Sequence, residues 1–289
     1  MHNITLTVFT PAYNREKKLS FLYESLKKQS DKNFRWLIVD DGSTDGTAAV
    51  VDSFIKEGAL DITYVYQKNG GKYKAHNHGV ILCDTELFVC VDSDDSLLPD
   101  AVRDTKELWS KISCDNKICG IVSPRKMKGD EYFKNCPKKG TLMNLYNKGS
   151  FSGETMIVFR TDVLKKYLFP EIDGENFMSE CVIYNQIDKE YVLYYDNRFH
   201  YAGEYLEDGL TRNAVSLEKK NPISTMITYK NIAAFQTDFI KAAKAYGSYL
   251  AWIEKYSLED KFTDYRVKFF VKLAGALLKK HYKDLFARI

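Results

Sequence analysis

One stretch, residues 87–99, constrains the fold of this chain more than any other. An apolar run, Leu-Phe-Val-Cys-Val, leads directly into three carboxylates, Asp92, Asp94 and Asp95. The β-branched and aromatic residues of the run predict a buried strand. Open α/β sheets bind ligands beyond the carboxyl ends of their strands. The stretch therefore predicts such a sheet, with acidic side chains delivered to a binding crevice.

Three explanations account for these carboxylates. Because clustered carboxylates repel one another, a hard divalent cation with oxygen ligands, Mg²⁺ or Mn²⁺, is an expected counterpart. A simpler interpretation is a turn in which Asp92 or Asp94 caps the next helix. A calcium-binding EF-hand that starts at Asp92 needs Gly at its sixth place and Glu at its twelfth. The chain has Leu97 and Arg103 there, which excludes an EF-hand.

Strands and helices alternate along the first part of the chain. The predicted strands are residues 4–9, 34–39, 62–66 and 87–91. The predicted helices between them are residues 15–29, a helix through Val50, Val51, Phe54 and Ile55, and residues 75–82. This order is typical of a doubly wound, mostly parallel α/β sheet flanked by helices.

The second part of the chain predicts fewer strands and ends in helices. We expect helices at 99–111, 161–169 and 177–187, strands at 118–123, 155–159 and 191–195, and helices from about residue 214 to the end. The predicted division is a domain over 1–215, in two halves (1–123 and 124–215), followed by a helical extension over 216–289.

Composition narrows the function classes. A net charge of +3 is too small to indicate a nucleic-acid partner. The opening residues 1–4 show no basic-then-apolar signal region, and no apolar run reaches the roughly 18 residues of a membrane span, so we expect a cytoplasmic protein. The six cysteines include no Cys-x-x-Cys pair, which favours buried thiols over zinc or disulfides.

The C-terminal residues 264–289 carry an amphipathic pattern. Val267, Phe270, Val271, Ala274, Leu277 and Leu278 are predicted to share one helix face. Between Phe262 and Ile289, seven Lys or Arg stand against two Asp. This charge suits peripheral contact with an anionic membrane, although a packed helix with a solvated basic face is the simpler explanation.

Four polar segments follow successive strands: residues 10–14, 40–47, 67–74 and 92–95. Because the carboxyl ends of parallel strands share one edge of the sheet, these segments should converge. An aromatic ring, a carboxylate for a base N–H, a loop with Gly and Lys, and carboxylates for a metal are the parts of a nucleoside-diphosphate site. Neither Gly-x-Gly-x-x-Gly nor a P-loop motif is present, so a dinucleotide fold and a P-loop are not supported.

At this point the chain resembles a known family, the family 2 glycosyltransferases of the GT-A fold. Five motifs carry the resemblance in order over residues 4–102: Thr10-Pro11-Ala12-Tyr13-Asn14, Leu26-Lys27-Lys28-Gln29-Ser30, Val39-Asp40-Asp41-Gly42-Ser43-Thr44-Asp45-Gly46-Thr47, Ala75-His76-Asn77-His78-Gly79 and Asp92-Ser93-Asp94-Asp95. The family usually has Arg where this chain has His76. The positive charge of that Arg must here come from His76, Lys72 or Lys74.

The resemblance implies inverting transfer of a sugar from a nucleoside diphosphate, usually UDP, to a hydroxyl of a glycan acceptor. By position it implies that Pro11, Tyr13 and Asp41 hold the nucleoside, with Arg15 near it, and that Lys72 and His76 also bind the donor. Residues 1–123 would then be the nucleotide-binding half and residues 124–215 the acceptor-side half. Asp92 and Asp94 would hold Mg²⁺ or Mn²⁺, with Asp95 beside them.

The family's general base usually lies in an acidic Glu-Asp motif, which corresponds here to Glu180-Cys181. Glu180 is the first candidate and Glu175 the second. Glu180 is equally well explained as a carboxylate in the first turn of a helix. The segments 169–180 and 205–211 resemble a subgroup linked to bacterial surface polysaccharides, and His200 and Arg212 are structural residues or diphosphate contacts.

The sequence therefore indicates a metal-dependent transferase whose acceptor is a glycan, carried on a lipid at the inner face of the plasma membrane. One alternative is a nucleotide-sugar-binding partner protein without catalysis, because Cys181 stands where the family usually has Asp. A nucleotidyltransferase is a weaker alternative, because no Gly-rich, basic loop follows the first strand.

Overall fold

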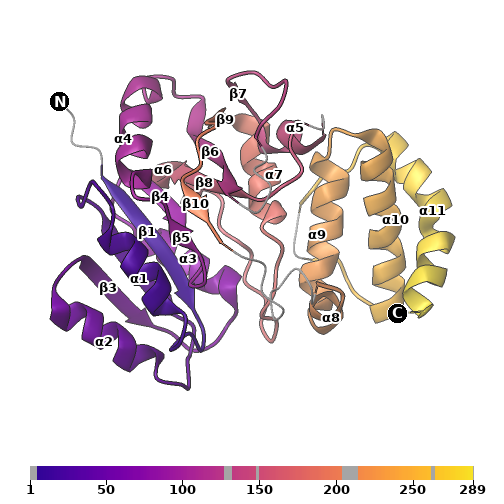
Figure 1. The fold of residues 1–289 in the computed structure, drawn as a ribbon. Coiled ribbons are helices and arrows are strands. Elements are labelled where there is room, and N and C mark those ends of the chain that lie inside the picture. The colour runs from indigo at the N-terminus through magenta and orange to yellow at the C-terminus, as the bar shows by residue number, and fades with distance from the viewer. Residues whose placement is uncertain (1–4, 127–131, 148–149, 204–213, 262–263, 289) are drawn as a thin grey trace. The chain divides into compact units, whose positions relative to one another are not determined.

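The structure, a computed structural model, describes residues 5–126, 132–147, 150–203, 214–261 and 264–288. The chain forms two compact units (Figure 1). The first, which we call the sheet unit, consists of residues 1–168 and 191–206, and the second, the helical unit, of residues 169–190 and 207–289.

The sheet unit contains all the strands and the first six helices. In chain order they are β1 (Leu6–Ala12), α1 (Leu19–Lys27), β2 (Arg35–Asp40), α2 (Thr47–Glu57), β3 (Asp61–Tyr66), α3 (Lys72–Leu82), β4 (Leu87–Cys90), β5 (Ser96–Leu97), α4 (Ala101–Ile112), β6 (Ile118–Lys126), β7 (Lys139–Gly140), α5 (Leu142–Asn147), β8 (Thr155–Arg160), α6 (Thr161–Leu164), β9 (Val192–Tyr195) and β10 (Tyr201–Ala202).

The strands form one ten-stranded sheet in the order β3-β2-β1-β4-β8-β6-β10-β5, with β9 between β6 and β7. Strands β3, β2, β1 and β4 are parallel, as the alternation of strands and helices predicted. From β8 onward the sheet is mixed, because β8 is antiparallel to both β4 and β6. The α/β class is confirmed, and the parallel character belongs chiefly to the first four strands.

Helices cover both faces of the parallel strands, as a doubly wound sheet requires. On one face, α1, α2 and α4 bury side chains such as Leu22, Phe54 and Trp109 against alternate strand residues, among them Val8 and Trp36. Phe9 points to the other face, where it stacks on Phe88 beside α3. The two sets of side chains alternate along β1 because successive residues of a strand point to opposite faces.

Several predicted elements differ from the observed ones in detail. Helix α1 begins at Leu19 and not at residue 15, and Asn14, just before the predicted start, lies in the left-handed region with φ 53°. The helix that follows β8 is a single turn, α6. The two-residue strands β5, β7 and β10 and the short helix α5 were not predicted, because so few residues carry no periodic signal.

The helical unit consists of α7 (Cys181–Glu190), α8 (Ala214–Lys220), α9 (Pro222–Phe235), α10 (Phe239–Tyr256) and α11 (Phe269–Arg288). Helices α9, α10 and α11 lie side by side (Figure 1). The expected division assigned residues 169–190 to the transferase domain, but they pack with the C-terminal helices. Asn231 of α9 explains part of this packing, since its side chain donates to the Val182 carbonyl of α7 and accepts from Asn185.

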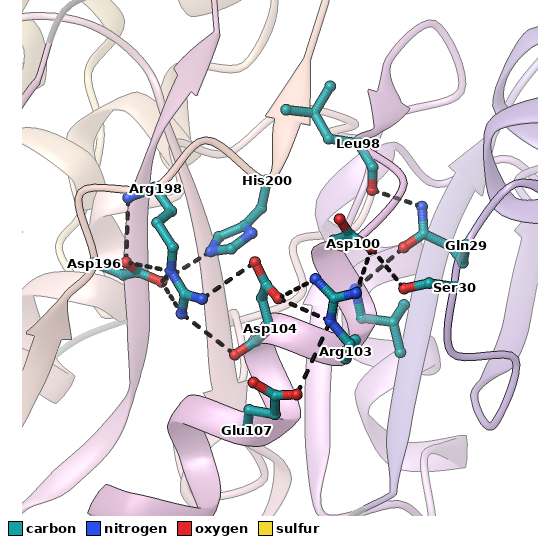
Figure 2. A network of polar contacts seen from close by, with 11 residues as sticks. Gln29, Ser30, Leu98, Asp100, Arg103, Asp104, Glu107, Asp196, Arg198 and His200 are labelled. Atoms are coloured by element: carbon teal, nitrogen blue, oxygen red, sulfur yellow. Dashed lines mark hydrogen bonds and ion pairs between the residues drawn. The ribbon is translucent and has the colours of Figure 1, made fainter.

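A polar network fixes the segment that follows the three aspartates (Figure 2). Arg198 bridges Asp104 of α4 and Asp196, with 2.9 Å between Arg198 Nη2 and Asp196 Oδ2. At the other end, Gln29 donates to the Leu98 carbonyl and Ser30 donates to Asp100. These contacts tie residues 98–104 both to the end of α1 and to the loop between β9 and β10.

Candidate active site

The polar segments of the sheet unit meet at one edge, as the strand order requires. Backbone hydrogen bonds continue past the strand ends: Asp41 N donates to the Ala12 carbonyl, Gln67 N to the Asp40 carbonyl, and Val91 N to the Phe9 carbonyl. The segments after β1, β2, β3 and β4 therefore leave the sheet side by side. The predicted convergence is confirmed for the loops of the sheet unit.

The first two loops are joined through Asn14. Its left-handed backbone lets its N–H donate to Ser43 Oγ, while its side-chain oxygen accepts from Thr44 N. Asn tolerates this conformation better than most residues because its short amide bonds locally. The Arg15 N–H donates to Thr47 Oγ1 at 2.8 Å, so the backbone at Arg15 is also fixed to α2. Pro11 and the exposed ring of Tyr13 stand at the start of this joined pair of loops.

Asp41 organises the third loop. Its buried carboxylate accepts hydrogen bonds from the backbone N–H groups of Gly70 and Gly71, at 2.9 and 2.7 Å, and from the side-chain amides of Gln67 and Asn69. A carboxylate that receives several N–H donors is well compensated for its burial. Asp41 thereby holds the glycine loop at the N-terminus of α3. Sequence analysis found Asp41 but not this role, because its donors lie 26 to 30 residues away.

Lys72 forms an ion pair with Asp92. Its ammonium lies 2.9 Å from each carboxylate oxygen of Asp92, and both side chains are partly exposed. The helix start at Lys72 thus brings a cation to the end of β4. Lys74 instead lies over the ring of Tyr73, 5.5 Å from its centroid.

His76 cannot supply the charge that the family usually places there. Its ring is buried in α3 against Phe9 and Phe88, with centroid distances of 5.9 and 5.5 Å. Burial, together with the nearby Lys72, lowers the pKa of His76 to about 3. The imidazole is therefore neutral near pH 7, and of the three candidates Lys72 is the one that stands beside the carboxylates.

The three aspartates after β4 have different surroundings. Asp92 and Asp94 are half-buried, whereas Asp95 is buried and faces Arg125 and Tyr201. Arg125 Nη2 lies 2.5 Å from Asp95 Oδ1, and the Tyr201 hydroxyl donates to Oδ2. Asp95 was expected beside the cofactor, but its carboxylate is engaged in this buried ion pair. It connects the acidic turn to β6 and β10.

This buried ion pair shapes the backbone around it. Burial raises the pKa of Asp95 to about 7, although Tyr201 and Arg125 oppose the rise. Gly203 follows β10, and a Cβ there would meet Asp95 Oδ1 at 1.8 Å. Only glycine fits at this position. Neither Arg125 nor Gly203 stands in a recognisable motif, so the sequence alone did not reveal them.

The two candidate bases belong to the helical unit and differ in their contacts. Both oxygens of the buried Glu175 accept backbone hydrogen bonds at the start of α9, from Ile223 N and Ser224 N, each at 2.7 Å. Glu175 is thus a helix cap. Glu180 is exposed and immediately precedes α7. Burial raises the pKa of the Cys181 thiol to about 11, so Cys181 carries no charge near pH 7.

His200 and Arg212 are the remaining candidates from the second half of the chain. His200 is buried, and its Nε2 lies 2.8 Å from Asp196 Oδ2 (Figure 2). Burial alone would raise the pKa of Asp196, but the hydrogen bonds of His200 and Arg198 lower it to about 2. His200 is therefore part of the structural network. Arg212 and the segment 205–211 lie outside the described residues.

Asp92 and Asp94 suit a hard divalent ion only if substrate completes the site. Among the residues that the structure describes, no group of three or more His, Cys, Asp or Glu side chains is placed to hold a metal ion. Mg²⁺ and Mn²⁺ accept one or two carboxylates together with substrate phosphates. Two half-buried carboxylates, with Asp95 turned into its ion pair, match that requirement.

The family model of glycosyl transferase family 2 matches residues 7–168, more than half of the chain. The chain belongs to this family. The matched span contains the sheet edge formed by the carboxyl ends of the parallel strands, with Pro11, Tyr13, Asp41, Lys72 and Asp94.

Similar proteins agree with this family and with the GT-A fold. A Campylobacter jejuni enzyme described as a GalNAc(5)-diNAcBac-PP-undecaprenol beta-1,3-glucosyltransferase is 26% identical over 83% of this chain and 76% of its own. The structure of Staphylococcus aureus TarS 1-349 with UDP-GlcNAc matches at TM-score 0.63 and 18% identity, over 99% of this chain and 92% of TarS. A Pyrobaculum calidifontis mannosyltransferase with GDP-Man and Mn²⁺ matches at TM-score 0.56 and 15% identity, over 95% and 86%.

Proposed function

We propose that this family 2 transferase moves a hexosyl or N-acetylhexosaminyl group from a UDP-sugar to a hydroxyl of a glycan, with inversion, in bacterial surface-polysaccharide synthesis. The observation that carries the proposal is the Lys72–Asp92 pair beside Asp94, at the sheet edge where Tyr13 is exposed. The UDP-GlcNAc in the TarS structure and the undecaprenol-linked acceptor in the name of the Campylobacter relative support the donor and acceptor classes.

The nucleoside is proposed to lie over the joined first loops. Tyr13, with 47% of its surface exposed, offers a ring for stacking on the base, and Pro11 and Arg15 flank it. Asp41 is the proposed acceptor for a base N–H. Because four donors already share this carboxylate, the base would replace the side-chain amide of Gln67 or Asn69 there.

The diphosphate is proposed to lie between Lys72 and the acidic turn. Asp94 and Asp92 would hold Mg²⁺ or Mn²⁺, which neutralises charge on the leaving diphosphate. With Asp92 holding the cation, the Lys72 ammonium would bind a phosphate oxygen. The N-terminus of α3 adds backbone N–H groups and a favourable dipole for an anion.

Glu180 is the proposed general base. Inversion in one displacement needs a carboxylate that takes the acceptor's hydroxyl proton as its oxygen attacks the anomeric carbon. Glu180 is exposed, whereas Glu175 caps α9 and the Cys181 thiol stays protonated near pH 7. The environment of Glu180 therefore favours it over both neighbours.

Thermal unfolding with nucleotides tests the donor site. UDP, GDP, CDP and ADP are added with and without Mn²⁺ to the wild type and to Asp94→Ala, with Asp52→Ala on the exposed face of α2 as control. We expect UDP to raise the midpoint only with the metal, because a ligand stabilises the state it binds. The shift should disappear in Asp94→Ala and persist in Asp52→Ala. No shift with any nucleotide would contradict the proposal.

Release of UDP from UDP-GlcNAc in the presence of glycan acceptors tests catalysis. Glu180→Gln keeps size and removes the base, so we expect unchanged donor binding and a fall in turnover of about 100-fold or more. Glu175→Gln is the matched variant, and we expect it to lower stability through the α9 cap. Nucleotide binding without turnover on any acceptor would instead support the partner protein without catalysis.

A further inference from the structure

Helix α11 has two apolar faces, and packing uses only one of them. Val271 and Gly275 are buried on the side that packs on α10, together with Phe286 near the end of the helix. Phe269, Phe270, Leu273 and Leu277 are exposed, with 72%, 71%, 56% and 81% of their surfaces accessible. The sequence pattern placed Val267, Val271, Phe270 and Leu277 on one face, and the structure separates them.

The four exposed residues form one stripe, which we call the α11 stripe. Phe270, Leu273 and Leu277 follow Phe269 by one, four and eight residues. This spacing places the four residues along one side of the first turns of the helix. The packed side fixes this orientation through close contact between helices. A Cβ added to Gly275 would lie 2.8 Å from the Ala243 carbonyl oxygen, and one added to Gly247 would lie 3.1 Å from the Gly275 carbonyl oxygen. The stripe therefore cannot turn inward without separating α10 from α11.

The start of α10 exposes further apolar surface at the same end of the helical unit. Helices α10 and α11 run in the same direction, because Gly275 lies against Ala243 whereas the later Phe286 carbonyl accepts from Lys255. Phe239 and Ile240, in the first turn of α10, are 52% and 64% exposed. Both helices thus present large apolar side chains in their first turns.

Cations flank the α11 stripe. Lys268, Lys272 and Lys280 are exposed on α11 or just before it, and Lys241 and Lys244 are exposed on α10. The sequence from Tyr265 to Lys283 holds six Lys or Arg and no Asp or Glu. Exposed Phe and Leu bordered by Lys are the composition of helices that lie in the interface of an anionic bilayer.

We propose that the α11 stripe, with its flanking lysines, docks this transferase on an anionic phospholipid bilayer. Charge favours a bilayer over a second copy of the chain, because a symmetric contact would place the lysines of one copy against those of the other. No helix in the described part of the chain is long and apolar enough to cross a membrane, so the contact is one with the surface. The inference deepens the lipid-carrier part of the proposed function and does not depend on the donor.

Flotation of the full chain with vesicles tests the docking surface. The vesicles are phosphatidylcholine alone, or phosphatidylcholine with phosphatidylglycerol. We expect binding only to the anionic vesicles, and weaker binding as salt rises because of screening. The double variant Phe270→Ser/Leu277→Ser should lower partitioning about tenfold or more, since it removes the apolar contact. Phe21→Ser, at an exposed Phe of α1, is the matched control and should bind as wild type.

Two further measurements distinguish the outcomes. The variant Leu277→Trp should shift its Trp fluorescence emission to shorter wavelength with anionic vesicles only, because the new ring enters the bilayer interface. The double variant should keep its thermal midpoint, its mass in solution and its UDP-dependent shift, so a failed donor site is told apart from a failed docking surface. Equal vesicle binding by wild type and the double variant would overturn the proposal. So would a dimer that the double variant converts to monomer, which would assign the stripe to a second copy.

Discussion

The sheet unit and the contact between α10 and α11 near Gly275 bury different kinds of side chain. The sheet unit buries large aromatic side chains, such as Tyr23, whose ring stacks on Phe54 at 3.9 Å, and it also buries charged groups such as Asp41, Asp95 and Arg125. The helical unit has a small core cluster of Ala233, Ala242, Ala245, Val267 and Val271, and it exposes Phe269, Phe270 and Leu277.

This difference follows from the two architectures. A parallel sheet covered by helices has room for large cores, and its strand ends gather polar groups that pair with one another. Near Gly247 and Gly275 the helices approach so closely that only small side chains fit between them. Phe269, Phe270 and Leu277 are exposed there, whereas Trp252 and Phe286 pack together further along the pair. We infer that the sheet unit holds the donor site, whereas α10 and α11 of the helical unit provide a surface. The following predictions test this comparison, from the largest expected effect to the smallest.

The buried ion pair should matter far more than an exposed one. The side chains of Arg125 and Asp95 are 7% and 5% exposed, whereas those of Lys283 and Glu254 in the helical unit are 60% and 41% exposed. We expect Arg125→Met to lower the free energy of unfolding by about 3–5 kcal/mol, because Asp95 is left buried without its cation. Lys283→Met should cost about 0–1 kcal/mol.

Urea unfolding of both variants measures this difference. The double variant Arg125→Met/Asp95→Leu should recover part of the loss, since it leaves no buried charge without a partner. Equal effects of Arg125→Met and Lys283→Met would break the contrast between the units.

The two lysines at the start of α3 should differ in function. Lys72→Ala removes the cation beside Asp92, so we expect kcat/KM for the sugar donor to fall about 100-fold through lost electrostatic stabilisation. Lys74→Ala, whose ammonium lies over Tyr73, should change it less than about threefold, the scale of a screened surface charge. Steady-state kinetics with UDP-GlcNAc provides the measurement, and similar losses in both variants would place the diphosphate elsewhere.

Close packing in the helical unit predicts an unusual response to alanine. Within a helix, Gly→Ala normally stabilises by about 1 kcal/mol. Gly275→Ala should instead destabilise the helical unit by about 1–3 kcal/mol, because its Cβ would overlap the Ala243 carbonyl oxygen and Tyr246 Cβ. Ala276→Ser, at an exposed position of the same helix, is the control. Thermal unfolding compares them, and a stabilised Gly275→Ala would show that α10 and α11 are less tightly packed.

The neutral His76 predicts acid sensitivity of the sheet unit. Its pKa in the folded protein is lowered to about 3 from 6.5, so below pH 6.5 the unfolded chain binds a proton that the folded protein does not. Stability therefore falls as pH drops from 6.5 toward 3, with a slope approaching about 1.4 kcal/mol per pH unit from this group. His76→Phe keeps an aromatic ring beside Phe9 and should flatten that slope. Urea midpoints at pH 7 and pH 5 test this, and parallel slopes in both proteins would contradict it.

Much of the sheet unit could be predicted from sequence because its signals are local. The apolar run before Asp92, the spacing of Leu19, Leu22 and Leu26, and the polar residues at strand ends each lie within a few neighbouring residues. The strand order then brings these ends together, as the backbone bonds from Asp41, Gln67 and Val91 confirm. Elements of two residues, such as β5 and β10, carry no such pattern and were missed.

Contacts between distant residues were decided only by the tertiary structure. The sequence by itself determined the family, the α/β class and the candidate residues, since motifs and periodicity are properties of neighbouring positions. It did not determine which of three aspartates is buried, because Arg125 and Tyr201 lie 30 and 106 residues beyond Asp95. Nor did it determine that α11 exposes Phe269, Phe270 and Leu277, because that depends on how closely Gly275 approaches α10. Burial and pairing depend on the neighbours that folding supplies, and so the roles of these residues were settled only in three dimensions.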